Sequence, residues 1–217
     1  EKSEYVKQDI DKAIRYFTLA SDLNDAEAQY HLSYIYESSG YVPRDINKAI
    51  EYLIRSANQN YAKAQSLLAY YYLEGTYIPR DINKAIHYFS LAANQNEANA
   101  QNNLGVIYLE NEHIPRDIDK AIHYFSLAAN QNEANAQYNL GVIYLEKEYI
   151  PRDIDKAIHY LSLAANQNYV AAQSKLGEIY YKGVYVPRDI PKAIHYYSLA
   201  ANQNYVVAQS KLGEIYY

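Results

Sequence analysis

The 217-residue sequence contains no cysteine, no methionine and no tryptophan, and it has only 7 glycines and 6 prolines. Without cysteine, the chain forms no disulfide and carries no thiol chemistry. The scarcity of glycine and proline argues against a disordered chain or a flexible linker. No apolar run approaches the roughly 18 residues of a membrane-spanning helix, so we expect no membrane partner.

The net charge is mildly negative, −5 at pH 7, which argues against a nucleic-acid partner that depends on phosphate neutralisation. No positively charged segment followed by an apolar run marks a signal peptide, and the composition indicates no compartment. The sequence begins at Glu1 rather than at methionine, which indicates a fragment, a processed chain or an engineered protein. The loss of three residue types is consistent with design, but copying of one methionine-free unit explains it equally well.

What is present is a 36-residue pattern that recurs six times without a gap. Lys-Ala and Ala-Gln recur with this period, and so does Pro-Arg-Asp, with prolines at Pro43, Pro79, Pro115, Pro151 and Pro187. A fixed period of this size is typical of a solenoid, in which each unit stacks on its neighbours. The sequence therefore predicts one domain over residues 1–217. An enzyme is disfavoured, because repeated units form long surfaces more readily than single catalytic pockets.

Each repeat contains two amphipathic segments. In residues 97–110, apolar or small side chains follow the helical spacing i, i+3, i+4, i+7, which predicts a first helix, called helix A. Asn96 is its expected N-cap, and Pro115 prevents the helix from continuing. Asp117 is expected to cap a second helix, called helix B, over residues 118–130.

The asparagine-rich turn after helix B is expected to place asparagine in the left-handed backbone region that glycine often takes. By the phase of the repeat, the chain opens on a helix B and closes on a helix A. The predicted segments are a helix B at 9–22, helix pairs at about 25–58, 61–94, 97–130, 133–166 and 169–202, and a helix A at 205–217.

Small residues recur in the middle of helix A, at Gly105, Gly141, Gly177 and Gly213. Glycine costs about 0.5–1 kcal/mol there relative to alanine, so its recurrence predicts a close approach of helix B of the same unit. We expect Ala121 and its equivalents to face the glycine. The 28 tyrosines also follow the period: Tyr36, Tyr72, Tyr108, Tyr144, Tyr180 and Tyr216 are expected core positions of helix A, and Tyr52, Tyr88, Tyr124, Tyr160 and Tyr196 recur on helix B.

Helix A reads Ala-Gln-x-x-Leu-Gly-x-x-Tyr and helix B reads Asp-x-x-Lys-Ala-x-x-Tyr-x-x-x-Ala-Ala. Residues 134–166 carry the whole pattern. This pattern resembles the Sel-1-like repeat, a relative of the tetratricopeptide repeat, over essentially the whole chain. The resemblance implies an all-α, right-handed solenoid of antiparallel helix pairs, with A helices on the concave side and B helices on the convex side. The family mainly scaffolds protein complexes. A cysteine-rich bacterial branch has been linked to penicillin-type ligands, but without cysteine that activity is not carried over.

Histidine, aspartate and arginine each recur at one position of the 36-residue repeat, and we call these three series the polar ladders. Histidines at adjacent repeats lie too far apart to share a metal ion, and we interpret the aspartates as caps and the arginines as local partners of carboxylates or loop carbonyls. No glycine-rich phosphate loop, HExxH motif or nucleophile elbow is present, so we predict no catalytic, metal or cofactor site. The ladders are His87, His123, His159 and His195; Asp9, Asp45, Asp81, Asp117, Asp153 and Asp189; and Arg44, Arg80, Arg116, Arg152 and Arg188.

The resemblance implies that a ligand would contact the concave face of the A helices. The groove residues singled out in this way are Tyr30, Tyr34, Lys63, Ser66, Tyr70, Asn99, Asn102, Asn135, Tyr138, Val142, Ser174 and Glu178, and the same face carries Glu27, Glu37, Leu73, Val106, Tyr181, Ser210 and Glu214. With Glu74, Glu110, Glu146 and Lys182, the groove holds seven glutamates and two lysines. Such a groove suits a segment with basic and apolar anchors.

Two hypotheses for function follow. The first is a scaffold that binds a peptide or a partner segment in the concave groove, and the second is an engineered or consensus repeat array with no evolved ligand. The last helix A has no following helix B, and its apolar face is complementary to the N-terminal helix B. We therefore also predict head-to-tail self-association through the two uncapped ends.

Overall fold

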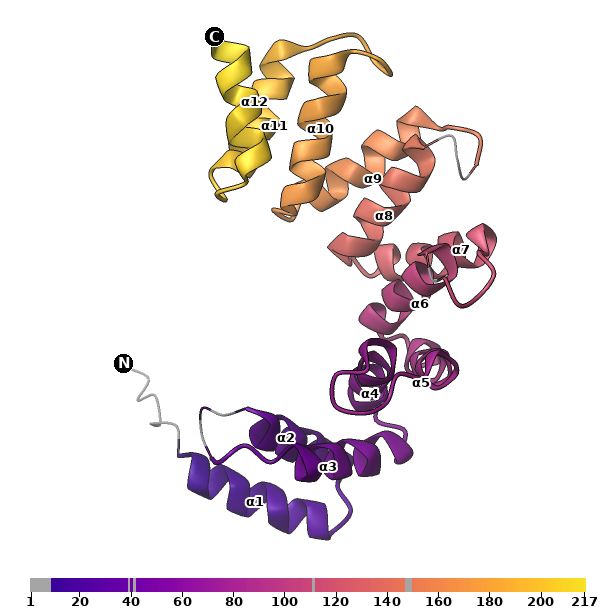
Figure 1. Cartoon of the computed structure of the whole chain (residues 1–217), viewed down its shortest axis with the longest axis vertical. Coiled ribbons are helices and arrows are strands. Elements are labelled where there is room, and N and C mark those ends of the chain that lie inside the picture. Colours follow the sequence, from indigo (N-terminus) through magenta and orange to yellow (C-terminus); the bar gives the residue numbers. More distant parts are fainter. Residues whose placement is uncertain (1–8, 39, 41, 111, 147–149) are drawn as a thin grey trace, which may run out of the picture. The chain divides into compact units, whose positions relative to one another are not determined.

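The structure is a computed structural model that describes residues 9–38, 40, 42–110, 112–146 and 150–217. By the contacts between Cα atoms, the chain divides into two compact units, Glu1–Ala100 and Gln101–Tyr217, and each unit is described by itself. The described residues form twelve α-helices and no strand (Figure 1). Even-numbered helices are the A helices and odd-numbered helices are the B helices.

The helices follow the repeat along the chain. The A helices α2, α4, α8 and α10 each pack against the helix B of their own repeat and against the helix B that precedes it, as α2 does with α3 and α1, and α10 with α11 and α9. This confirms the predicted all-α solenoid of antiparallel helix pairs. That all 217 residues form one domain stays a prediction. The helices are α1 (Ile10–Asp22), α2 (Ala26–Glu37), α3 (Ile46–Asn58), α4 (Ala62–Glu74), α5 (Ile82–Asn94), α6 (Ala98–Glu110), α7 (Ile118–Asn130), α8 (Ala134–Leu145), α9 (Ile154–Asn166), α10 (Val170–Lys182), α11 (Ile190–Ala201) and α12 (Val206–Tyr216).

The aspartates cap the B helices, as predicted. The Asp117 carboxylate accepts a hydrogen bond from the backbone N–H of Lys120 at 3.0 Å, and the Lys120 ammonium lies 3.1 Å from the same carboxylate. These bonds favour the charged form and lower the pKa of Asp117. The same backbone bond recurs at Asp9, Asp45, Asp81, Asp153 and Asp189.

The turn between repeats holds asparagine in left-handed backbone, with φ of 66° at Asn132 and 65° at Asn96. The expectation that Asn96 caps helix A is therefore wrong, because an N-cap residue needs extended backbone. Glu97 takes that place, and its carboxylate accepts a hydrogen bond from the N–H of Ala100. Glu133 caps α8 in the same way. The equivalent N-cap residues without a side-chain cap bond are Tyr61, Tyr169 and Tyr205.

The mid-helix glycines lie against helix B of their own repeat, as predicted. A β-carbon at Gly105 would stand 2.6 Å from the ring of Phe125, and one at Gly141 would stand 2.6 Å from Leu161. The residue over the glycine is therefore Phe125, and the expectation that Ala121 faces it is wrong. Because Gly105 has no β-carbon, helix A leaves room for the large side chain of Phe125, which lies one turn after Ala121 on helix B.

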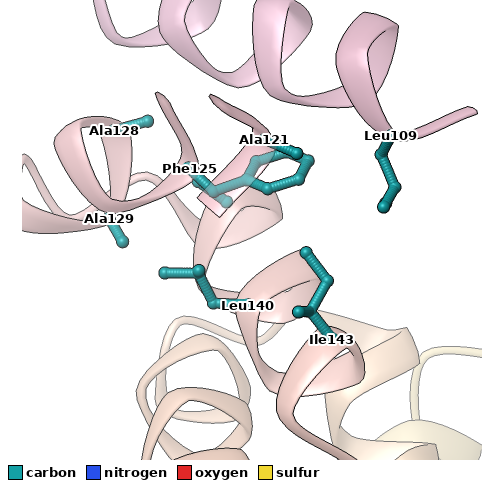
Figure 2. Packing of buried hydrophobic residues seen from close by; sticks show 8 residues of the cluster. Leu109, Ala121, Phe125, Ala128, Ala129, Leu140 and Ile143 are labelled. Carbon is teal, nitrogen blue, oxygen red and sulfur yellow. The ribbon is translucent and has the colours of Figure 1, made fainter. Parts of the chain in front are cut away.

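Each core layer is built by three consecutive helices. In the layer of Figure 2, α6 contributes Leu109, α7 contributes Ala121 and Phe125, and α8 contributes Leu140 and Ile143. Phe125, Leu140 and Ile143 are fully buried. In this layer, the helix B lies between two A helices and packs its apolar side chains against both.

A buried glutamine in the A helices links the two neighbouring B helices. Gln137 donates a hydrogen bond to the Ala129 carbonyl oxygen at 3.4 Å, and its own side-chain oxygen accepts one from Gln167 at 2.8 Å. Gln137 is 1% exposed, so the interior satisfies both ends of its amide, as a buried polar group requires. The same glutamine pair recurs as Gln29–Gln59, Gln65–Gln95, Gln101–Gln131 and Gln173–Gln203.

Stacked tyrosines join helix A to helix B. The rings of Tyr108 and Tyr124 are 5.8 Å apart and nearly parallel, and the Lys120 ammonium lies 4.9 Å from the Tyr108 ring. Tyr72, Tyr108, Tyr144 and Tyr180 are half-buried and pack at the edge of the core, whereas Tyr216 is 70% exposed, so the expectation of a core position is wrong for Tyr216. The hydroxyls of the half-buried tyrosines stay near the surface while the ring faces are covered. The other stacked pairs are Tyr36–Tyr52, Tyr72–Tyr88, Tyr144–Tyr160 and Tyr180–Tyr196.

Candidate ligand surface on the A helices

In the first unit, the predicted groove residues lie on α2 and α4. Tyr34 and Tyr70 occupy the same position of consecutive repeats, and their side chains are 59% and 45% exposed. Lys63 is exposed as well, whereas Ser66 is half-buried. Two large aromatic side chains are thus left outside the core on neighbouring A helices.

Two other predicted groove tyrosines are engaged within the chain. Tyr30 on α2 packs against Tyr61 with ring centroids 5.5 Å apart, and Tyr138 on α8 packs against Tyr169 at 5.2 Å. Burial raises the pKa of both Tyr30 and Tyr138. These rings join adjacent repeats, so removing either one would weaken the fold as well as any ligand contact.

The asparagines at predicted groove positions are held by neighbouring side chains. Asn99 and Asn135 each donate to the carboxylate of the glutamate two residues earlier, at 3.1 and 2.7 Å. Asn102 accepts a hydrogen bond from Asn139 of α8 at 3.2 Å. Their orientations are therefore fixed within the chain. The remaining predicted positions, Val142, Ser174 and Glu178, are half-buried.

A cavity of about 450 Å³ lies at the C-terminal end of α2. Two predicted groove residues, Tyr34 and Glu37, meet loop residues of their own repeat and of the next one in its wall. A ligand on the α2 surface would reach this cavity beside the exposed Tyr34 ring. The lining residues are Tyr34, Glu37, Ser38, Arg44 and Tyr77.

Hydrogen bonds fix the walls of this cavity. Arg44 donates to the carbonyl oxygen of Glu37 at 3.1 Å and to the hydroxyl oxygen of Tyr77 at 2.9 Å, and its guanidinium lies 5.4 Å from the Tyr77 ring. Tyr71 lies behind the wall, 5% exposed, with its hydroxyl near the Glu37 carboxylate. Burial raises the pKa of Tyr71, and the Glu37 carboxylate raises it further.

A second cavity, of about 210 Å³, lies between α8 and α10 in the second unit. Its charged groups pair with each other: the Lys175 ammonium lies 4.0 Å from Glu146 and 3.5 Å from Glu178, and Lys182 also pairs with Glu178. Burial acts to raise the pKa of Glu178, but the two lysines outweigh it and lower the pKa. The charges of this cavity are therefore neutralised internally. Its lining residues are Leu145, Glu146, Lys175, Glu178, Ile179, Lys182, Val184 and Tyr185.

The polar ladders have structural partners. Arg80 and Arg152 donate to the carbonyl oxygens of Leu73 and Leu145, as Arg44 does at Glu37, which confirms the local interpretation for these arginines. The ladder histidines are exposed, and each packs edge-on against the following tyrosine. Within the described ranges, no three His, Asp or Glu side chains gather as a metal site, and none of the helices there has the length and apolar character of a membrane span.

Tyr71 and Tyr77 are candidate residues that the periodic pattern does not single out. The signal that reveals Tyr71 is its departure from the period. Isoleucine stands at this position in the five other repeats, at Ile35, Ile107, Ile143, Ile179 and Ile215.

Comparison with protein families finds the Sel1 repeat at residues 1–25, 26–61, 62–97, 98–133, 134–169 and 170–205. A comparison with curated proteins gives no match.

Solved structures with similar folds include three bacterial proteins. A protective antigen of uropathogenic Escherichia coli strains, which displays an SLR fold, is 29% identical with a TM-score of 0.89 over 94% of this chain and 44% of the antigen. The chain thus spans less than half of that antigen. A Sel1 repeat protein from Oxalobacter formigenes is 28% identical, with a TM-score of 0.85 over 94% of this chain and 83% of that protein. An immunity protein from Pseudomonas aeruginosa, 18% identical with a TM-score of 0.60 over 93% and 76% of the two chains, shares the fold alone.

Proposed function

The chain belongs to the Sel1 repeat family, whose members are generally non-enzymatic scaffolds for protein interactions, and from this premise we propose that its A helices bind a segment of a partner protein. The observation that carries the proposal is the exposure of Tyr34 and Tyr70 at the same position of consecutive A helices. Large aromatic side chains tend to dominate the binding energy of protein interfaces. The contact surface is the groove of A-helix positions that contains these two tyrosines.

The charge of the groove supports a basic partner segment. In the first unit, Glu27, Glu37 and Glu74 lie on the predicted face with one lysine, Lys63, so its electrostatic potential favours lysine and arginine on the ligand. The tyrosine rings add apolar surface for a hydrophobic anchor. We therefore propose a segment that carries both basic and apolar side chains.

An array of 12-residue peptides with systematically varied charge and aromatic content tests this function. Peptides that combine basic and apolar residues should bind, and Tyr70→Ala should weaken their binding by about tenfold, since such aromatic contacts are often worth more than 1 kcal/mol. His123→Ala and His159→Ala, which alter exposed B-helix positions, should leave binding unchanged. If no peptide binds above background, the chain is a structural repeat array. If the histidine variants lose binding and Tyr70→Ala does not, the ligand lies on the B helices.

We further propose that chains of residues 1–217 associate head to tail. The support is that Tyr16 and Tyr216 are 66% and 70% exposed, although their equivalents stack on each other in the repeats between them. No atom of the described residues lies within 4 Å of a β-carbon built at Gly213, where a helix B would pack. Light scattering over a range of concentrations tests this association.

A further inference from the structure

We propose that the cavity beside Tyr34 is the anchor site for a lysine side chain of the bound segment. The ammonium pairs with the Glu37 carboxylate, and the aliphatic stem lies against the rings of Tyr34 and Tyr77. This inference rests on the proposed function, because it assigns one anchor of the partner to one place in the first unit.

The carboxylate in this cavity is a departure from the repeat. Leucine stands at the position of Glu37 in the next three repeats, at Leu73, Leu109 and Leu145, and Leu109 and Leu145 are buried. Glu37 changes together with Tyr71 of the following repeat, which takes the place of isoleucine and brings a hydroxyl near the new carboxylate. Glu37 is half-buried and lines the cavity.

The Glu37 carboxylate is open to a cation from outside. Among the described residues, no lysine or arginine side chain forms an ion pair with it. In the cavity of the second unit, by contrast, lysines of the chain itself pair with Glu146 and Glu178. The first cavity is also the larger one, about 450 Å³ against about 210 Å³.

Arg44 carries the other charge of this cavity, and it is already engaged. Its Nε and Nη2 atoms donate to the Glu37 carbonyl and to the Tyr77 hydroxyl, and its guanidinium lies beside the Tyr77 ring. Arginine stands at this position in five repeats and bonds to helix A in the same way at Arg80 and Arg152. Arg44 is therefore part of the repeat structure, and Glu37 is what distinguishes this cavity.

The geometry favours lysine over arginine. Arginine binds a carboxylate best through two parallel hydrogen bonds, which need both oxygens. An ammonium needs only one oxygen of the Glu37 carboxylate, so it binds there without a matching two-point geometry. The lysine stem can cover apolar ring surface while its charged end reaches the carboxylate, and its ammonium gains from the face of a tyrosine ring.

Four pentapeptides with acetylated and amidated ends test this assignment, namely Ala-Ala-X-Ala-Ala with lysine, arginine, norleucine or glutamate as X. Two-dimensional NMR titration of the full chain measures their binding. The lysine peptide should shift the amide signals of Glu37, Ser38, Arg44 and Tyr77 and bind about fivefold more tightly than the norleucine peptide, as an exposed ion pair allows. Glu37→Gln keeps a side-chain oxygen near Tyr71 and should remove this difference. Glu51→Gln, the same charge change on the exposed face of α3, should not.

The double variant Glu37→Leu with Tyr71→Ile installs the residue pair of the other repeats and should fold and lose the lysine preference. The proposal is overturned if the norleucine, arginine or glutamate peptide binds as tightly as the lysine peptide, or if Glu37→Gln retains the preference. These outcomes differ from a failure of the proposed function. If Tyr70→Ala weakens the binding of array peptides but Glu37→Gln does not change it, the proposed peptide-binding groove is supported and the lysine site is wrong. If no array peptide binds, the function is wrong, whatever the pentapeptides show.

Discussion

The ring of Phe125 on α7 lies so close to the backbone of Gly105 on α6 that a β-carbon at residue 105 would stand 2.6 Å from two ring atoms. Real β-carbons do not approach this closely, so the contact depends on glycine. The same relationship holds between Gly177 and Tyr197, at 2.7 Å. The glycine of helix A and the large side chain of helix B are therefore a matched pair that sets the approach of the two helices.

Gly105→Ala should destabilise the second unit by about 1–3 kcal/mol, because overpacking a filled core forces neighbouring side chains to shift. Urea unfolding measures the change. Gly213→Ala is the matched control, since no described atom lies within 4 Å of its β-carbon position. That variant should be neutral or slightly more stable, because alanine is the better helix former. Equal destabilisation by both variants would contradict the close-contact explanation.

The positions of the helices can be predicted from the sequence, because the same two amphipathic segments recur in every 36-residue repeat. The predicted helix B at 118–130 is the observed α7, Ile118–Asn130. The pairing of Gly105 with Phe125 was not predictable in the same way. Ala121 and Phe125 share the apolar face of α7, and only the relative rotation of the two helices decides which one lies over the glycine.

Ser21→Ala should stabilise the first unit by about 1 kcal/mol, because a buried polar group without a partner is costly. Ser21 is 1% exposed, and in the described residues its hydroxyl has no hydrogen-bond partner. Alanine stands at this position in the following repeats, at Ala57, Ala93, Ala129 and Ala165.

Ser56→Ala is the control for Ser21→Ala, since the Ser56 hydroxyl donates to the Ala26 carbonyl oxygen at 2.6 Å. Loss of that bond should destabilise the unit by about 1 kcal/mol. The two serine-to-alanine changes should therefore move the midpoint of urea unfolding in opposite directions. A shift in the same direction would show that the hydrogen bond is not what separates the two sites.

The candidate site was only partly predictable from the sequence. The groove predicted from the A-helix positions includes both Tyr34 and Tyr138. In the structure, Tyr138 is half-buried against Tyr169, whereas Tyr34 is exposed. The ring that packs against Tyr138 belongs to the next repeat, so a single-repeat pattern does not contain it. The approach of Tyr71 to Glu37 also joins two repeats. A comparison of all repeats position by position does reveal it, because both residues depart from the period.

Asp117→Asn should reduce the stability of the second unit at neutral pH and have less effect in acid. The hydrogen bond from the Lys120 backbone N–H and the contact with its ammonium lower the pKa of Asp117 below its ordinary value of 3.8. A carboxylate with a lowered pKa in the folded state contributes stability above its unfolded pKa and loses it as the pH falls through the folded value. The difference between wild type and variant should therefore be complete at pH 7 and shrink below about pH 4.

Urea unfolding at several pH values checks this dependence on Asp117. Glu110→Gln serves as the control, because it removes one negative charge from an exposed position at the C-terminal end of α6 without removing a cap. Its effect should not follow the same pH profile. A difference for Asp117→Asn that stays constant down to pH 2 would contradict the assigned role of the charge.

Head-to-tail association should depend on residues at the two ends of the chain of residues 1–217. Tyr16 on α1 and Tyr216 on α12 occupy the positions of the stacked pair Tyr124 and Tyr108. Phe17 likewise occupies the position of Phe125, so on a second chain it would meet the open backbone of α12. The α1 of one chain therefore presents the side chains that the α12 of another lacks.

Light scattering should show a mass that rises above the 25.0 kDa of one chain as the concentration increases. A polar capping helix added after Tyr217 should abolish the rise, because it covers the face on which α1 would pack. Tyr16→Ser and Tyr216→Ser should each weaken it, since each removes half of one aromatic stack. Tyr34→Ser, which removes an exposed tyrosine away from both ends, should leave the rise intact. A wild-type mass that stays at one chain at high concentration would reject association in solution, and a rise that survives the cap would place the contact elsewhere on the surface.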